Sequence, residues 1–128
     1  MQLKSFFLVL AILLVSAGTS AQAAKPTIFG GYDCGQWIRK GKGHPMESWA
    51  VGYLSGLNWM HVAAGLKPND PLDELNSVDQ IYVWLDNYCK AAPLQRVDLG
   101  VVTLFEELKA KRSQVESSAK SDDDHTKN

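Results

Sequence analysis

The sequence has 128 residues, with 13 basic and 14 acidic side chains and a formal net charge of −1 at neutral pH. Its basic residues are scattered along the chain, which excludes the clustered positive surface that binds nucleic acids. A chain of this length forms one small domain with a core of limited size.

The first 23 residues have the features of a secretory signal peptide. Lys4 supplies a positive charge, residues 6–15 form an apolar run, and Ala-Gln-Ala at 21–23 has the small-x-small form of a cleavage site. Thr-Ser-Ala ending at Ala21 offers a second cleavage point. The apolar run is shorter than the roughly 20 residues that a membrane-spanning helix needs. We therefore expect residues 1–23 to be removed, which leaves a periplasmic protein with no membrane segment.

Cys34 and Cys89 are the two cysteines of the chain. In the oxidising environment that follows export, an even number of cysteines indicates a disulfide, and a bond that closes so long a loop stabilises a small domain by about 4 kcal/mol. A catalytic cysteine would need an activating histidine, and a zinc site would need three or four closely spaced ligands. His44, His61 and His125 form neither arrangement. We predict an intramolecular disulfide, with an intermolecular disulfide and free thiols as the alternatives.

The chain after the signal peptide begins with a short helix and a long one. Asp33 is a good N-cap for a helix that runs through Lys40. A long helix follows over 45–64, where Pro45 suits the first turn and Gly65 the end. Apolar side chains recur along it every three or four residues, which predicts one core-facing side. Its members are Met46, Trp49, Ala50, Tyr53, Leu54, Leu57, His61 and Ala64.

A second side of the long helix carries the small residues Gly52, Ser55, Gly56 and Ala63. Glycine inside a helix costs about 1 kcal/mol relative to alanine. We expect a compensating gain, and the close approach of another backbone is the simplest one.

A third helix follows the loop at 67–76. Ser77 and Gln80 have the spacing of a capping box. The helix that they start should end before Pro93, because the residue preceding a proline avoids helical angles.

A last amphipathic helix is predicted from Leu94 to about Arg112, with Asp98 on its polar side. Residues 113–128 are polar and are expected to be disordered. The predicted fold is thus a small all-α bundle of three to four helices over residues 24–112. One disulfide closes it and ties the first helix to the C-terminal end of the third.

Two tryptophans and one acidic loop are candidates for binding a partner. Trp59 lies off the core-facing side, and Trp59 and Trp84 are of a type enriched at interfaces, with core packing as the alternative. The loop carries Asp70, Asp73 and Glu74, and a solvated acidic loop is the alternative there, since the glycine and the alternation of a calcium loop are missing.

The remaining polar residues do not form a recognisable catalytic or metal-binding motif. His61 could sense acid, since histidine changes charge near pH 6.5, or it could be a half-buried helix residue. Asp86 and Asn87 could form a polar site or bond the end of their own helix. No acid pair, catalytic triad or phosphate loop is present in the sequence, so we expect no enzyme, no metal and no cofactor.

The segments "YDCGQWI" (32–38) and "ESWAVGYLSGLN" (47–58), with a second cysteine in a later helix, resemble the HdeA-type periplasmic proteins. The resemblance covers roughly Tyr32 to Leu108 and implies a bond between Cys34 and Cys89 and a central helix over 50–58. It also implies an acid-stress chaperone that is dimeric at neutral pH and exposes apolar surface to unfolding clients in acid. The same outline resembles the Tai-type immunity proteins, which neutralise type VI secretion effectors in the periplasm.

Three hypotheses about function result. The first is a periplasmic, stress-related helical protein that binds unfolding clients and forms a homodimer. The second is an immunity-type inhibitor of one cognate effector. The third is an exported enzyme or small-ligand carrier. The first two require a protein partner, and none requires nucleic acid.

Overall fold

A computed structural model describes residues 27–28, 30–40 and 43–125, with side chains up to residue 120. These residues form four α-helices and one short 3-10 helix, and they contain no β-strand. In chain order the elements are α2 (Cys34–Arg39), α3 (Pro45–Ala63), η2 (Pro71–Glu74), α4 (Val78–Ala91) and α5 (Val97–His125). The predicted all-α bundle with one disulfide is confirmed. The predicted signal peptide lies outside the described residues.

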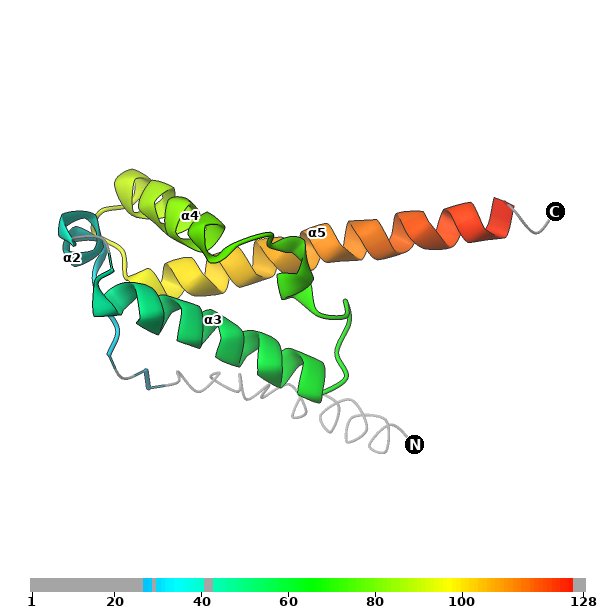
Figure 1. The fold of residues 1–128 in the computed structure, drawn as a ribbon, viewed down its shortest axis with the longest axis horizontal. Coiled ribbons are helices and arrows are strands. Elements are labelled where there is room, and N and C mark those ends of the chain that lie inside the picture. The colour runs from blue at the N-terminus through cyan, green and yellow to red at the C-terminus, as the bar shows by residue number, and fades with distance from the viewer. Residues whose placement is uncertain (1–26, 29, 41–42, 126–128) are drawn as a thin grey trace, which may run out of the picture.

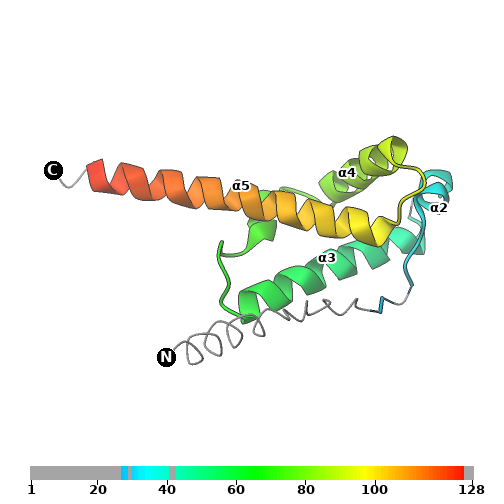
Figure 2. The same cartoon turned by 180° about the vertical axis from the view of Figure 1, so that it is seen from behind.

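Helix α5 is the central element of the bundle. Its first half lies between α3 and α4, and α2 lies at the end where α5 begins (Figure 1). The view from behind shows the same order (Figure 2). The second half of α5 extends beyond the other helices, so the packed bundle occupies one end of the molecule.

Local sequence signals explain where the helices begin. The Asp33 side chain accepts the N–H of Gln36 at 2.7 Å, and the Gln36 side chain accepts the N–H of Asp33 at 3.1 Å. This capping box satisfies two backbone groups that the first turn of α2 leaves unpaired. At the start of α4, the Gln80 side chain accepts the N–H of Ser77 at 3.4 Å. Asp33 and Ser77 are the N-caps that the sequence predicts.

Local signals also end α3 and α4. Gly65 has a φ of 64°, and the N–H of Leu66 donates to the carbonyl of His61 at 3.2 Å. Together these features form a Schellman motif, in which a left-handed glycine caps the helix. Helix α4 ends at Ala91, before Pro93, as predicted.

The core lies along the first half of α5. Its side chains there pack against apolar residues of α3 and α4, and Trp37 of α2 belongs to the same buried cluster. Each fully buried aliphatic side chain contributes about 1.5–3 kcal/mol. The buried apolar residues are Cys34, Trp37, Met46, Ala50, Leu54, Ile81, Leu85, Cys89, Val97, Val101, Leu104, Phe105 and Leu108.

The predicted close approach of a backbone at Gly52 and Gly56 is wrong for the described chain. A Cβ added at either glycine would meet nothing within 4 Å. The close approach occurs instead at Gly100 of α5, where an added Cβ would lie 2.8 Å from the Tyr88 ring. Helices α4 and α5 therefore need a glycine at their contact, whereas α3 carries its glycines on an open side.

Helix α5 differs from the prediction at its start. It begins at Val97, and Leu94 lies in the preceding turn with its side chain 98% exposed. The turn is closed by the N–H of Gln95, which donates to the carbonyl of Ala92 at 3.0 Å. Asp98, predicted on the polar side of the helix, is buried.

Helix α5 also differs at its end. The predicted end near Arg112 and the disordered tail from Ser113 are corrected by a helix that continues to His125. Residues 113–125 contain neither proline nor glycine, and elongation of an existing helix needs no new nucleus. Glu116 also lies one turn after Arg112, with 3.7 Å between its Oε1 and the Arg112 Nε.

Candidate protein-binding surfaces

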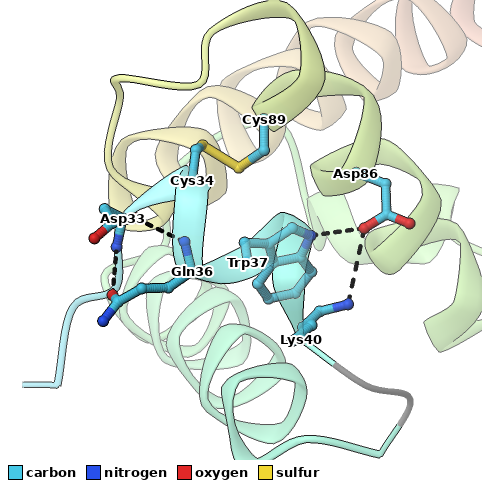
Figure 3. The surroundings of a disulfide bond; sticks show 7 residues. All are labelled: Asp33, Cys34, Gln36, Trp37, Lys40, Asp86 and Cys89. Atoms are coloured by element: carbon cyan, nitrogen blue, oxygen red, sulfur yellow. Dashed lines mark hydrogen bonds and ion pairs between the residues drawn. A yellow bond between two sulfur atoms is a disulfide. The ribbon is translucent and has the colours of Figure 1, made fainter.

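The disulfide joins α2 to the last turn of α4. Cys34 and Cys89 are bonded and fully buried, with their Cα atoms 4.9 Å apart. Beside them, the Trp37 Nε1 donates to Asp86 Oδ1 at 2.7 Å, and the Lys40 Nζ lies 4.2 Å from the Trp37 ring centroid (Figure 3). Asp86 therefore fixes the packing of α2 on α4. The cysteines and Asp86 hold the bundle together and offer no free site.

One side of α3 is exposed and uncharged. We call it the outward face. Trp59 is 74% exposed there, and Met60 at its margin is 72% exposed. Not one of its members carries a charge, and Gly52 and Gly56 leave open space above the helix. The outward face comprises Ser48, Gly52, Ser55, Gly56, Trp59, Ala63 and, just after the helix, Leu66.

A shallow hollow adjoins the outward face. Its volume is about 260 Å³, and it lies between α3, η2 and the start of α4. Its walls are mostly apolar side chains, which suits it to receive an apolar group. The lining residues are Val51, Ser55, Leu72, Leu75, Asn76, Ser77, Val78 and Ile81.

The two candidate tryptophans have different environments. Trp84 is half-buried, stacks on Tyr88 with centroids 5.5 Å apart, and donates from Nε1 to Glu107 at 2.9 Å. Trp84 therefore belongs to the packing of α4 on α5. Trp59 lies on the outward face of α3 and remains exposed. The two tryptophans do not form one binding surface.

The acidic loop is tied to α5 by ion pairs. The Glu74 carboxylate lies 3.2 Å from Lys111 Nζ and 3.4 Å from Arg112 Nη1, and Asp73 lies 3.0 Å from the same Arg112 atom. Glu116 of α5 accepts the N–H of Asn69 at 2.9 Å. We call the set Asp73, Glu74, Lys111, Arg112 and Glu116 the loop clamp.

The electrostatics of Glu74 follow from these contacts. The hydrogen bond from Lys111 lowers the pKa of Glu74 below its ordinary value of 4.5, and Arg112 adds to the effect. A lowered pKa means that Glu74 stabilises the fold while it is ionised. Asp70, the remaining candidate of the loop, accepts a hydrogen bond from Asn58 Nδ2 at 2.8 Å. The three predicted acidic residues therefore bond within the chain.

His61 lies beneath the same loop. It is buried, its Nε2 lies 2.8 Å from the carbonyl oxygen of Pro68, and its ring meets Phe105 edge-on with centroids 5.7 Å apart. The sequence places it on the core-facing side but does not reveal the Pro68 carbonyl. The histidine thus links α3, the loop and α5.

A second hollow lies at the start of α5, with a volume of about 430 Å³. Arg96 Nε donates to Asp98 Oδ1 at 2.8 Å at its wall. Burial, together with the nearby Asp98, raises the pKa of Tyr53. No sequence motif signals this site, because α3, the start of α5 and residues 27–28 come together to form it only in the folded chain. The lining residues are Thr27, Ile28, Tyr53, Arg96, Asp98, Leu99 and Val102.

Comparison with protein-family models, curated proteins and solved structures finds no match for this chain. Within residues 27–28, 30–40 and 43–125, no group of three His, Cys, Asp or Glu residues is placed to hold a metal ion. Among the helices of that part of the chain, none has the length and apolar character needed to cross a membrane.

Proposed function

We propose that this chain is an exported, non-enzymatic protein of the HdeA-like acid-stress chaperone type, which binds unfolding proteins in strong acid. The observation that carries the proposal is the loop clamp, because acid removes its negative charges. The resemblance of residues 32–108 to HdeA-type proteins supports the same function.

Acid acts directly on the loop clamp. Protonation of Asp73, Glu74 and Glu116 removes the partners of Lys111 and Arg112. A group with a lowered pKa stabilises the fold above its ordinary pKa, and this contribution is lost as the pH falls through the lowered value. For Glu74 that window lies below pH 4.5. The loop clamp is therefore intact at neutral pH and lost in strong acid.

Release of the loop would expose apolar surface. Pro68 and Pro71 of the loop are buried, and so are His61, which contacts the Pro68 carbonyl, and Phe105, which contacts the His61 ring. The disulfide at the other end of the bundle continues to hold α2 on α4. The chain would open at one end only, which provides an apolar surface for clients without complete unfolding.

The net positive charge that the chain acquires in acid also favours opening of the bundle. Residues 1–23 contain one basic residue, Lys4, and no acidic one, so the exported chain has 13 − 1 = 12 basic side chains. Protonation of its 14 acidic side chains leaves these 12 and three histidines. A strongly cationic chain repels itself, which favours the open form and keeps the protein in solution.

The test is suppression of client aggregation at about pH 3 and at neutral pH. We expect suppression in acid alone. The triple variant Asp73→Asn/Glu74→Gln/Glu116→Gln imitates the protonated loop clamp, so its activity should begin at higher pH. The matched control is Asp79→Asn/Glu106→Gln, which changes exposed carboxylates outside the loop clamp and should behave as the wild type. Lack of suppression at severalfold molar excess contradicts the proposal.

An immunity-type inhibitor is the second candidate, and the outward face of α3 favours it. Trp59 is exposed on α3, which is helical without a break from Pro45 to Ala63, and an exposed tryptophan on a formed helix suits recognition of one folded partner. Nanomolar binding to a toxic effector encoded beside this chain, lost in Trp59→Ala, would establish that function.

The hollow at Arg96 is the observation that bears on the small-ligand carrier. Native mass spectrometry of the protein purified from cells tests it directly. A bound metabolite that is lost in Arg96→Gln would support the carrier, and a single unliganded mass would exclude it.

A further inference from the structure

We infer that the hollow at the start of α5 binds a small carboxylic acid with an apolar body, whose carboxylate is held by the Arg96 guanidinium. Such a ligand would make the chain a carrier, so the inference rests on the small-ligand carrier function and names its ligand class. Binding at neutral pH does not depend on the chaperone function, which requires strong acid.

The walls of the hollow are mostly apolar. They come from residues 27–28, from α3 through Tyr53, and from α5 through Leu99 and Val102. The volume of about 430 Å³ lies within the range of small-molecule sites, which is about 300–1,000 Å³. A ligand with a hydrocarbon body therefore gains free energy by moving its apolar surface from water into this space.

The polar groups of the hollow lie together at the beginning of α5. Arg96 Nε donates to Asp98 Oδ1 at 2.8 Å, and Leu99 and Val102 follow these two residues along the helix. Burial and the charge of Asp98 raise the pKa of Tyr53, so its hydroxyl lies near this pair and remains a hydrogen-bond donor at neutral pH. The hollow thus has a polar end and an apolar remainder, which matches an amphipathic ligand.

The accessible charge at the polar end is positive. Arg96 and Asp98 are the charged lining residues, and the side chain of Arg96 is 54% exposed whereas that of Asp98 is 7% exposed. Asp98 binds the guanidinium through Nε, and within the described part of the chain neither Nη nitrogen donates a hydrogen bond. A guanidinium with free Nη donors pairs with a carboxylate through two parallel hydrogen bonds.

Gly31 leaves room for the Arg96 guanidinium. A Cβ added at Gly31 would lie 2.5 Å from Arg96 Nη2 and 3.6 Å from Asp98 Oδ1, so any other residue would displace the group. Asp98 holds the same guanidinium through Nε. Arg96 is therefore positioned before the ligand arrives, which lowers the entropic cost of binding.

The charge balance favours a carboxylate over an amine or a phosphate. An amine would meet the exposed charge of Arg96, while the carboxylate of Asp98 is already paired. A doubly charged phosphate would bring a second negative charge close to Asp98 without a second cation among the lining residues. A single negative charge matches the one guanidinium, and the positive end of the α5 dipole adds to the attraction.

Isothermal titration calorimetry at neutral pH with octanoate, octanol and octylamine tests the inference, because the three share one apolar body and differ in the polar group. Octanoate should bind about tenfold more tightly than octanol or better, and octylamine should bind more weakly than either. Val102→Phe fills the hollow and should weaken octanoate by about tenfold or more. The matched control is Val83→Phe on the exposed side of α4, which should bind as the wild type does.

Two further variants test the role of the guanidinium. Arg96→Lys keeps the charge and removes the fork, and Gly31→Ala displaces the guanidinium without changing the apolar walls. Each should weaken octanoate and leave octanol unchanged, whereas Gly52→Ala, which adds the same Cβ in open space, should change neither. Thermal midpoints show whether each variant has folded.

Absence of octanoate binding up to millimolar concentration overturns the inference. So does octanol that binds as tightly as octanoate, or octanoate binding that is unchanged in both Val102→Phe and Gly31→Ala. The carrier function can fail separately. Octanoate binding by a chain that leaves the cell without a ligand, as native mass spectrometry would show, upholds the site and excludes the carrier.

Discussion

The outward face of α3 and the loop clamp lie on the same small bundle. They differ in whether their side chains already contact other residues of the chain. In the loop clamp, Glu74 and Arg112 already bond within the chain. On the outward face, Trp59 is 74% exposed and Gly52 faces open space. The difference shows that charge density on a surface is a poor guide to a free binding site. The uncharged surface is the one left without a packing role.

Removal of the disulfide should have the largest effect, and it should affect both regions together. The variant Cys34→Ser/Cys89→Ser loses about 4 kcal/mol of stability in the chain-entropy estimate, against a total of about 5–15 kcal/mol for a typical domain. We expect a large fall in the urea midpoint measured by circular dichroism. The wild type with its disulfide reduced is the control and should fall equally. Equal midpoints with and without the bond would contradict a stabilising role for the disulfide.

Substitution at the contact of α4 with α5 should have the next largest effect. In Gly100→Ala the new Cβ would lie 2.8 Å from the Tyr88 ring, which is itself stacked on Trp84. Overpacking of this kind costs about 1–3 kcal/mol, and the better helix propensity of alanine offsets about 1 kcal/mol of it. Urea unfolding should show a lower midpoint with an unchanged slope. A midpoint equal to that of the wild type would show that Tyr88 can move aside.

Substitution in the loop clamp should give a smaller effect that depends on pH. Glu74→Gln removes the ion pairs with Lys111 and Arg112 and should lower the thermal midpoint at neutral pH. Because the pKa of Glu74 is lowered, the wild type loses the same contribution as the pH falls below 4.5. The two proteins should therefore differ at pH 7 and converge in strong acid. A constant difference at all pH values would show that the ion pairs do not carry the effect.

The sequence was sufficient for the parts of the fold that depend on near neighbours. Asp33 and Ser77 cap the helices that follow them, and Pro93 lies just beyond the end of α4, because the deciding contacts lie within a few residues. The disulfide was equally predictable from the sequence, since a predicted signal peptide and an even number of cysteines are enough to expect one. The bundle and its disulfide are therefore predictable without a structure.

The remaining features depend on contacts that are distant in the chain. Glu74 meets Lys111 and Arg112 only after η2 has packed on α5, so the sequence shows an acidic loop and not a clamp. Asp98 is buried because Arg96 pairs with it at the bundle end. Helix periodicity alone assigns such an aspartate to the solvent side.

Substitution on the outward face should have the smallest effect on stability, and in the opposite direction. Gly52→Ala adds a Cβ where no atom lies within 4 Å and removes the entropic cost of glycine, so the monomer should gain about 0.5–1 kcal/mol. The measurement is urea unfolding followed by circular dichroism at low micromolar protein. Gly100→Ala is the matched control, because the same chemical change at a closed contact should destabilise. A loss of stability in Gly52→Ala would mean that the outward face is already covered by part of the same chain, and the comparison between the two regions would then fail.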